Sequence, residues 1–321
     1  MHLNKLAPRR CKFIALTPYC SAIIPCTVLD NFIIIILAIL IEAFPFVVFG
    51  ALLSGIIEEF VPSSVVTRLM PKRLLPAVII GSVMGAALPM CECGSVLIVR
   101  RLLKKGIPTA SAITYMLAGP IVNPITLTST YVAYSWYPQM TLYRAGVGIA
   151  VAVLTGLVIY MFQRDSILQK QDSLELQLVR PEKPTASIRL KHALTHAMDD
   201  FIMIFSMLLL GATVTALFKA FSPAEVFMFF KAQEWIGVPV FAGLAFLLSL
   251  CSEADAFIAS ALNGIFDIPS QLAFLTLGPM LDLKLIMMYK KVFQKKVFFL
   301  LCTVPPMSII LICLMLQRGG M

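Results

Sequence analysis

The chain carries the same unusual sequence features twice, each time within apolar runs long enough to cross a membrane. A proline, a cysteine and a glycine recur at offsets of 161, 160 and 159 residues, so the register is kept with only two single-residue gaps. The matching pairs are Pro62 with Pro223, Cys91 with Cys251, and Gly119 with Gly278. We therefore predict an internally duplicated membrane protein with a polar centre.

Composition also indicates an integral membrane protein. The chain is 59% hydrophobic and 13% charged, with a mean hydropathy of +0.90, whereas a soluble domain is about 25% charged. Since a helical crossing needs ~20 apolar residues, we predict an all-α fold of eight transmembrane helices in two repeats of four, with broken helices near the membrane centre. The predicted spans are Phe32–Ile57, Leu74–Val99, Thr109–Tyr134, Ala145–Phe162, Phe201–Phe218, Ile236–Leu262, Ile268–Tyr289 and Val297–Leu316.

The distribution of charge divides the chain into four regions. Residues 1–30 form an N-terminal extension, which reads as a signal peptide, a short extra span or an unstructured segment. Residues 31–163 and 199–317 are the two membrane repeats, joined by a charged aqueous linker at 164–198 that lacks the apolar residues for a core of its own. Residues 58–71 and 219–234 are predicted to be interfacial helices that turn the chain between spans.

Basic residues predict a cytoplasmic N-terminus. In the first half, 14 Lys and Arg then lie inside, against four outside, one of which is Arg144. The second half disagrees, because Lys290, Lys291, Lys295 and Lys296 would lie outside. A segment that re-enters instead of crossing would remove the conflict, and this leaves an inverted repeat open. The net charge of +9 is explained by basic loops beside anionic lipid, so we expect no nucleic-acid partner.

Ionisable side chains interrupt the apolar runs at corresponding places in the two copies. Glu92 is the only charged residue in a run of 26 residues, and a carboxylate at the membrane centre costs roughly 2.5–3.5 kcal/mol on insertion scales. Five acidic residues stand against one base within the spans: Glu42, Glu92, Glu253, Asp255 and Asp282 against Lys284. If ionised, such a set attracts cations.

Glycine and proline lie beside these polar groups and predict discontinuous helices. Residues two positions apart project to different sides of a regular helix, so Cys91 and Cys93 can face one ligand only where the helix unwinds. Broken helices expose backbone groups and helix ends that transporters use to bind substrates or ions. The predicted binding residues are Cys91, Glu92, Cys93, Gly94, Gly119, Pro120, Asn123, Cys251, Glu253, Asp255, Gly278, Pro279, Asp282 and Lys284.

Cys91 and Cys93 are also the candidate metal ligands. Thiolates prefer soft ions and carboxylates prefer harder cations or protons, so this mixture fits a transition metal, a metalloid or proton coupling. A single C-x-C motif is a weak metal signal, and simple helix kinks at the Gly-Pro pairs or a structural ion pair between Asp282 and Lys284 are open alternatives. The sequence implies no cofactor.

The motifs LPMCECGSV, LAGPIVNPITL, LSLCSEADAF and LGPMLDLKL together resemble the YraQ-type predicted permeases of bacteria, relatives of the organoarsenical-efflux permeases. The resemblance covers roughly residues 32–316 and implies a multi-pass permease of the inner membrane. In the arsenical relatives a cysteine motif is thought to engage trivalent arsenic, and the matching positions are Cys91–Gly94. This chain has CECG where that branch has a CSCG-like form, and it has an acidic CSEAD in its second copy.

We therefore expect a gradient-driven permease for a small ion or small polar solute, and a thiophilic metal or metalloid is one candidate. The chain has no nucleotide-binding G-x-x-x-x-G-K-[ST] motif, so the energy comes from a gradient or from a partner chain. The expected partners are membrane lipids, the solute, and a membrane or extracytoplasmic protein. Two other classes stay open, namely an embedded enzyme acting on a lipid or isoprenoid substrate, and a non-transporting subunit of a membrane complex.

Overall fold

A computed structural model describes residues 26–60, 62, 74–87, 90–162, 167–168, 186–221, 237–248, 251–264 and 266–319. The predicted N-terminal extension and the two predicted interfacial helices lie mostly outside these residues. The described parts of the chain are helical apart from two isolated bridge pairs. Their helices are α1 (Cys26–Phe60), α3 (Leu74–Ala87), α4 (Glu92–Lys104), α5 (Thr109–Val122), α6 (Pro124–Ala133), α7 (Gln139–Phe162), α9 (Ala186–Phe221), α11 (Gly237–Leu248), α12 (Ser252–Ala261), α13 (Ile268–Leu277), α14 (Leu283–Val292) and α15 (Lys295–Arg318).

Within the described residues, five helical segments are long and apolar enough to cross a membrane. The prediction of an all-helical membrane fold is therefore confirmed. Shorter apolar helices at 74–86, 237–247 and 268–277 complete the apolar part of the fold. The five long segments are Phe32–Phe60, Thr109–Ala133, Gln139–Phe162, Leu190–Val214 and Lys295–Arg318.

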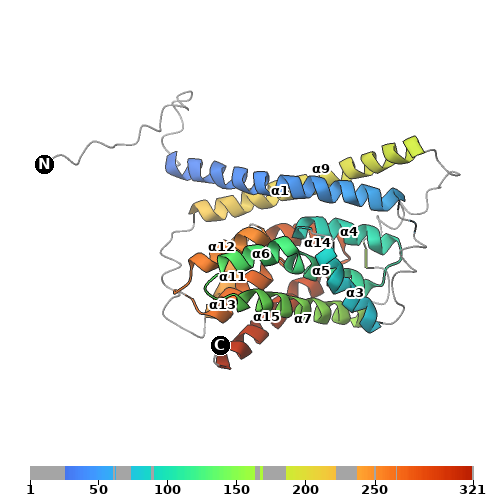
Figure 1. Cartoon of the computed structure of the whole chain (residues 1–321). Helices are drawn as coiled ribbons and strands as arrows, with labels where there is room; N and C mark the ends of the chain where they lie inside the picture. Colours follow the sequence, from blue (N-terminus) through green and yellow to red (C-terminus); the bar gives the residue numbers. More distant parts are fainter. Residues whose placement is uncertain are drawn as a thin grey trace.

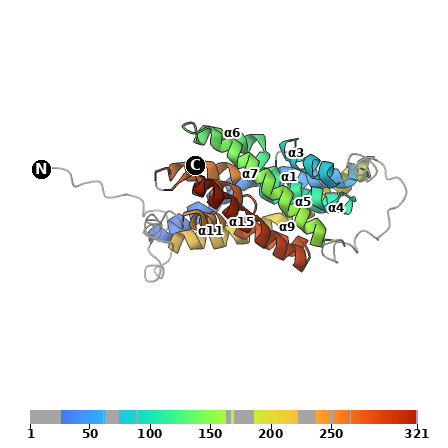
Figure 2. The ribbon, with the colours of Figure 1, turned by 90° about the horizontal axis from the view of Figure 1, so that it is seen from below.

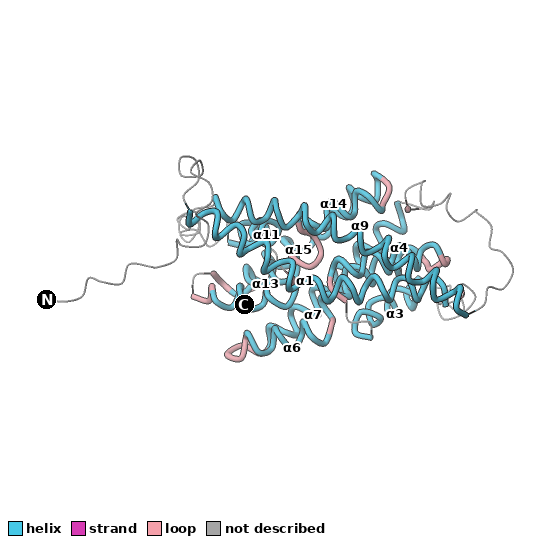
Figure 3. Tube along the Cα trace, turned by 90° about the horizontal axis from the view of Figure 1, so that it is seen from above, coloured by secondary structure: helices cyan, strands magenta, loops and turns pink. Residues whose placement is uncertain are grey.

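Helices α1 and α9 pack along each other and form a layer over the rest of the molecule (Figures 1 and 3). The ring of Phe44 in α1 makes an edge-to-face contact with that of Phe201 in α9, and Gly55, later in α1, contacts Ala193, earlier in α9. The two helices therefore run antiparallel. Viewed from below, α7 and α15 lie side by side on the opposite face (Figure 2). The shorter helices fill the space between these two layers.

The chain reverses between α3 and α4. Helix α3 runs parallel to α5, because Gly81 packs on Ser111 and Gly85 packs on Gly119. Helix α4 joins α5 through a short turn at Gly106, whose φ of 89° favours glycine, and α4 therefore runs back against α5. The predicted span over residues 74–99 is thus two short antiparallel helices rather than one crossing.

The second half contains the same kind of reversal. The start of α11, at Gly237, packs on Ser270 near the start of α13, so these two helices run side by side in one direction. Helix α12 joins α13 through a turn at Gly264, where φ is 81°. The predicted span over residues 236–262 is therefore also a helical hairpin. Gly106 and Gly264 occupy corresponding turns, 158 residues apart.

Both predicted Gly-Pro breaks lie beside real interruptions, but the first is displaced. Gly278 caps the end of α13, and α14 begins only at Leu283. Pro120 instead lies inside α5, and the helix breaks three residues later at Asn123, before Pro124. A proline removes the donor to the carbonyl four residues earlier, which here is Met116, and the hydroxyl of Ser95 donates to that carbonyl at 3.2 Å instead.

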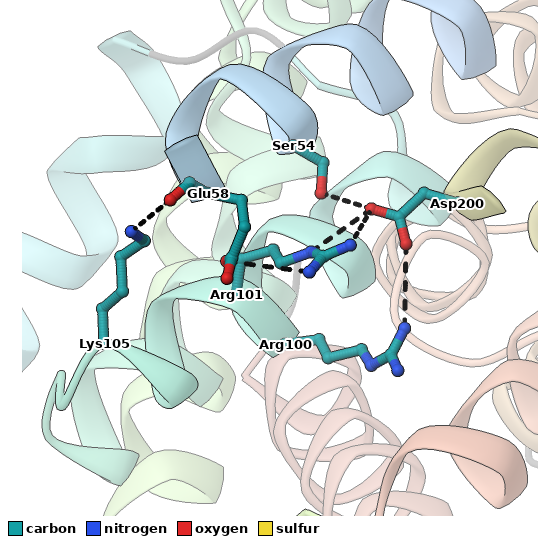
Figure 4. Close-up of polar contacts among 6 residues, drawn as sticks. All are labelled: Ser54, Glu58, Arg100, Arg101, Lys105 and Asp200. Carbon is teal, nitrogen blue, oxygen red and sulfur yellow. Dashed lines mark hydrogen bonds and ion pairs between the residues drawn. The ribbon is translucent and has the colours of Figure 1, made fainter. Parts of the chain in front are cut away.

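Helix α9 begins inside the region predicted to be an aqueous linker. It starts at Ala186, and its membrane-compatible part runs from residue 190 rather than from 201. The charge of Asp200 is accommodated because Arg101 donates to its Oδ2 at 2.9 Å and Ser54 donates to the same oxygen at 2.7 Å (Figure 4). Neutralised in this way, a charged residue can lie within a packed helix layer.

Candidate substrate site

Four helices begin at predicted site residues and point their N-termini towards one region. Their N-cap residues form two pairs with offsets of 160 and 159 residues, which are the offsets of the predicted repeat. Unpaired N–H groups and the helix dipole make each N-terminus electropositive, which favours nearby carboxylates. The N-caps are Cys91 of α4, Asn123 of α6, Cys251 of α12 and Asp282 of α14.

The caps explain locally why the helices start where they do. Asn123 accepts a hydrogen bond from the backbone of Ile125 at 3.0 Å, and Asp282 accepts one from Leu285 at 2.7 Å. Such side-chain caps replace missing intrahelical bonds at the first turn. At Cys91 the sulfur atom is the capping acceptor, and the backbone N–H of Gly94 donates to it at 3.4 Å.

Glu92 connects the first turns of three helices. It is 3% exposed, and the hydroxyl of Ser252 in α12 donates to its Oε2 at 3.1 Å. The ammonium group of Lys284 in α14 lies 3.7 Å from Oε1 of Glu92 and 3.1 Å from Oδ2 of Asp282. A carboxylate from the first half of the chain is thus held by a hydroxyl and a base from the second half.

A second set of charges lies beside the first. The hydroxyl of Thr126 in α6 donates to Oε1 of Glu253 at 3.0 Å, so a hydroxyl of the first half of the chain binds a carboxyl group of the second half. The buried guanidinium of Arg144 interacts electrostatically with Asp255 and with Glu253. Asp255 is fully buried, whereas Glu253 is half-buried.

Arg144 is the main residue that the sequence interpretation placed wrongly. It was counted in the first half as a loop residue on the outer side of the membrane. It is fully buried in α7. It donates to the hydroxyl of Thr130 at 2.6 Å and to the backbone carbonyl of Ser252 at 2.9 Å. The error arose because the predicted span began at residue 145, whereas α7 begins at Gln139. The apolar residues on both sides of Arg144 were the sequence signal that could have placed it within a membrane span.

The cysteines lie at the same centre without forming a metal cluster. Cys91 and Cys93 are buried and free, and Cys251 is half-buried. Cys93 interacts electrostatically with Lys284 and Glu92. Within the described ranges, no group of three or more His, Cys, Asp or Glu side chains has the geometry to hold a metal ion. The assignment of Cys91 and Cys93 as metal ligands stays a prediction.

Glycines bring the α1 and α9 layer close to this centre. Gly50 of α1 packs on Gly94 of α4. A Cβ atom added to Gly50 would lie only 3.3 Å from the Cα of Gly94. Gly211 of α9 packs on the aliphatic part of the Lys284 side chain. A Cβ atom added to Gly211 would lie only 2.5 Å from Cγ of Lys284. Gly50 and Gly211 are 161 residues apart, which is an offset of the predicted repeat. Glu42 lies in α1, but its side chain is not among those described.

Several buried hydrogen-bond donors near the centre have no protein partner among the described residues. Besides Nε of Arg144, they include the hydroxyl of Tyr115 and the amide nitrogen of Asn123. Tyr115 interacts electrostatically with Cys91, and its ring lies against Gly119. Buried donors usually find a partner, so these two groups are suited to a polar ligand.

The apolar crossing helices and this buried polar centre define a multi-pass membrane protein. The chain belongs to the family described as predicted permease, whose model matches residues 28–318. This confirms the resemblance drawn from the motifs and the expected membrane location.

Three relatives extend across most of the chain. The "UPF0718 protein YcgR" of Bacillus subtilis is 38% identical over 277 residues, covering 84% of this chain and 91% of the relative. The "Putative two-component membrane permease complex subunit" of Streptococcus mutans is 34% identical, covering 89% and 94%. The "UPF0718 protein YraQ" of Escherichia coli is 21% identical, covering 79% and 71%. No solved structure matches the chain.

Proposed function

We propose that this chain is a gradient-driven permease that moves a small ion or small polar solute past the four converging helix N-termini. The observation that carries the proposal is the position of Glu92, a buried carboxylate held by Ser252 and Lys284 of the other copy. Ionisable groups inside a membrane protein are costly and usually serve transport. The family description and the apolar crossing helices support a permease over an embedded enzyme.

We further propose that the two copies form an inverted repeat with three crossings each. In this arrangement α1, the broken α5–α6 pair and α7 cross in the first copy, and α9, the broken α13–α14 pair and α15 cross in the second. The α3–α4 and α11–α12 hairpins enter from opposite ends. Two contacts support this. Lys105, which follows α4, donates to the Glu58 carbonyl at 2.8 Å, near the end of the molecule where α5 begins. Ser260, near the end of α12, donates to the Ala133 carbonyl at 2.6 Å, at the other end of the α5–α6 pair.

This arrangement also removes the disagreement between the basic loops. Gln294, which lies between Lys291 and Lys295, donates to the backbone carbonyl of Ile167 at 3.0 Å, so that loop lies beside the segment following α7. Gly156 in the last turns of α7 packs on Ala110 at the start of α5, next to the basic turn that precedes it. We propose that this end of the molecule, on the right in Figure 1, faces the cytoplasm. Helix α1 then begins on the opposite side, so this proposal departs from the cytoplasmic N-terminus that the basic residues predicted.

The polar centre is suited to transport because its groups come from both copies. Rocking one copy against the other in alternating access would break and remake the Ser252–Glu92 and Thr126–Glu253 hydrogen bonds. The unpartnered donors of Tyr115 and Asn123 add hydrogen-bonding capacity for a polar solute. The outer apolar side chains, such as Ile41 and Leu142, are 72% and 74% exposed, as contact with lipid requires.

The direct test is uptake or release by vesicles that contain only this chain. Radiolabelled inorganic anions, monovalent and divalent cations, and small polar organic solutes should be screened under imposed pH and voltage gradients. The proposal expects gradient-dependent movement of at least one class above that in empty vesicles. Turnover of a lipid in detergent, without any gradient, would instead favour the embedded enzyme.

Glu253 offers a cleaner variant for this test than Asp255. Glu253 is half-buried and hydrogen-bonded to the neutral Thr126, so E253Q keeps the size of the side chain and removes the charge with little cost to folding. D255N would remove a charge that balances the buried Arg144. Transport that is lost in E253Q but kept in D267N, a change at an exposed helix cap, would assign Glu253 to the site.

A partner-dependent function is the second candidate, because the Streptococcus mutans relative is named as a complex subunit. On this alternative, the chain transports only when it is assembled with a second protein. Vesicles containing this chain alone would be inactive, and adding the co-purifying partner would restore transport. The same polar centre would then serve the complex.

A further inference from the structure

The acceptors and the donors of the polar centre are not used equally. Each carboxyl group of the centre interacts with a protein group, namely those of Glu92, Glu253, Asp255 and Asp282. By contrast, the Tyr115 hydroxyl and the Asn123 amide nitrogen are buried without a partner among the described residues, as is Nε of Arg144. The hydrogen-bonding capacity that the protein leaves open here is therefore that of donors.

The amide group of Asn123 is held at the N-terminus of α6. Its Oδ1 accepts a hydrogen bond from the backbone N–H of Ile125 at 3.0 Å, so the helix cap fixes the orientation of the amide. The side chain is fully buried, and Nδ2 lies beside the capped first turn because it shares a carbon atom with Oδ1. Asn123 thus presents a free N–H group at a helix start, where the dipole already favours electron-rich groups.

The hydroxyl of Tyr115 belongs to the same stretch of α5. The next residue, Met116, accepts a hydrogen bond from Ser95 in the first turn of α4 at 3.2 Å, so this part of α5 lies against the N-terminus of α4. The Tyr115 ring packs on Gly119, where an added Cβ atom would lie 3.5 Å from Cε2 of the ring. Gly119 is one turn before Asn123, so the ring extends along α5 towards the second unpaired donor.

Two other buried tyrosines show how this protein uses a hydroxyl group for structure. Tyr134 donates to Oε1 of Gln271 at 2.7 Å, and Tyr289 donates to the backbone carbonyl of Met280 at 2.9 Å. These two side chains and that of Tyr115 are each at most 1% exposed. A buried hydroxyl without a partner costs free energy, so the Tyr115 hydroxyl differs from the other two in having no structural use.

We propose that the transported solute presents acceptor oxygens to the Tyr115 hydroxyl and the Asn123 amide, and that these two residues determine its specificity. Small oxyanions such as carboxylates and phosphate carry such oxygens, and so do uncharged amides. The transport of this solute rests on the proposed function, whereas its binding does not. A hard metal cation would instead need free acceptor oxygens, and the carboxyl groups of the centre already have partners.

The first test compares the stability of Tyr115→Phe with that of Tyr134→Phe, each by thermal unfolding of the full chain without solute. Tyr115→Phe should melt at or above the wild-type temperature, because it removes a buried hydroxyl that has no partner. Tyr134→Phe should melt lower, because it leaves Gln271 without its donor. A Tyr115→Phe variant that melts below the wild type would overturn the proposal, since the hydroxyl would then have a structural role.

The second test is titration calorimetry of the full chain in lipid nanodiscs, with no gradient present. The probes are acetate, inorganic phosphate and acetamide, with Na⁺, K⁺ and Mg²⁺ chlorides as cation probes. We expect at least one of the first three to bind, and the charge of the probe that binds distinguishes an oxyanion from an uncharged solute.

Tyr115→Phe and Asn123→Ser should each weaken this binding by about tenfold, the effect of losing one hydrogen bond. Serine keeps a helix-capping oxygen at position 123, and Tyr134→Phe should bind with the wild-type affinity. Failure of acetate, phosphate and acetamide to bind would overturn the proposal. So would equal affinities in the wild type, Tyr115→Phe and Asn123→Ser, or binding of a cation alone.

Transport measurements distinguish this inference from the proposed function. Binding that is lost in Tyr115→Phe, in a chain that moves no solute alone or with its partner, would support the acceptor-oxygen site and refute the permease. Gradient-dependent movement of a cation at the wild-type rate in Tyr115→Phe and Asn123→Ser would support the permease and refute the acceptor-oxygen site.

Discussion

Glu92 and Ser252 lie 160 residues apart, which is an offset of the predicted repeat, and are hydrogen-bonded to each other at 3.1 Å. Each follows the cysteine that caps its helix, Cys91 in α4 and Cys251 in α12. The first turns of α4 and α12 therefore meet where the two halves of the chain pack together. This contact gives the polar centre its geometry and leads to the first prediction.

Ser252→Ala should destabilise the protein by about 1–3 kcal/mol, because it leaves a buried carboxyl oxygen without its donor. The measurement is the free energy of unfolding in mixed detergent micelles. Ser308→Ala is the matched control, since that hydroxyl bonds only within its own helix, to the Val304 carbonyl. Equal stability of the two variants would show that the Glu92–Ser252 bond contributes nothing.

Arg144→Met should destabilise the protein by about 1–3 kcal/mol for each buried acceptor left without a donor. The substitution removes the donors to the Thr130 hydroxyl and to the Ser252 carbonyl. Adding Asp255→Asn should recover part of the loss, because the uncompensated carboxylate is then neutral. If the double variant is less stable than Arg144→Met alone, the two residues do not form a charge pair.

Arg101 and Asp200 should be coupled in a double-mutant cycle by about 0.5–3 kcal/mol, as expected for residues in one buried network. We suggest Arg101→Met and Asp200→Asn, singly and together, with unfolding in detergent as the measurement (Figure 4). The pair joins α4 to the α1 and α9 layer. A coupling energy of zero would mean that the ion pair does not hold this layer to the rest of the bundle.

Gly211→Ala should destabilise the protein by about 1–3 kcal/mol, because the new methyl group would overlap the Lys284 stem. Gly243→Ala in α11 is the control. No heavy atom lies within 4 Å of its built Cβ, so the change should be neutral or stabilising through helix propensity. Thermal unfolding of the two purified variants under one condition gives the comparison. Similar melting temperatures would contradict the close contact between α9 and α14.

Cys91→Ser and Cys93→Ser distinguish a thiophilic substrate from other solutes. If the thiols bind substrate, both variants should impair handling of trivalent arsenicals and soft divalent metals far more than that of hard cations, because serine lacks a soft donor. Cellular accumulation and toxicity of such a panel are the measurements, with Cys313→Ser as the buried control elsewhere. An unchanged panel in both variants would remove the metal and metalloid alternatives.

The sequence alone was sufficient for the class of protein and for the break at Gly278, whereas the break predicted at Gly119 and Pro120 lies three residues later, at Asn123. Apolar runs of membrane length can only be helices when their backbone must be satisfied internally. The positions of Asn123 and Asp282 as helix caps also follow from local rules, since such residues start helices beside proline and glycine.

Only the tertiary structure decided which apolar runs reverse and which charges meet. The run at 74–99 is long enough to cross, and nothing in its composition shows that α4 turns back along α5. The contact of Arg144 with the Ser252 carbonyl, or of Glu92 with Ser252 and Lys284, joins residues more than a hundred positions apart. Hydropathy shows whether a segment is long and apolar enough to lie in lipid. Charge pairing instead depends on how separate segments pack against each other, and that packing is a property of the whole chain.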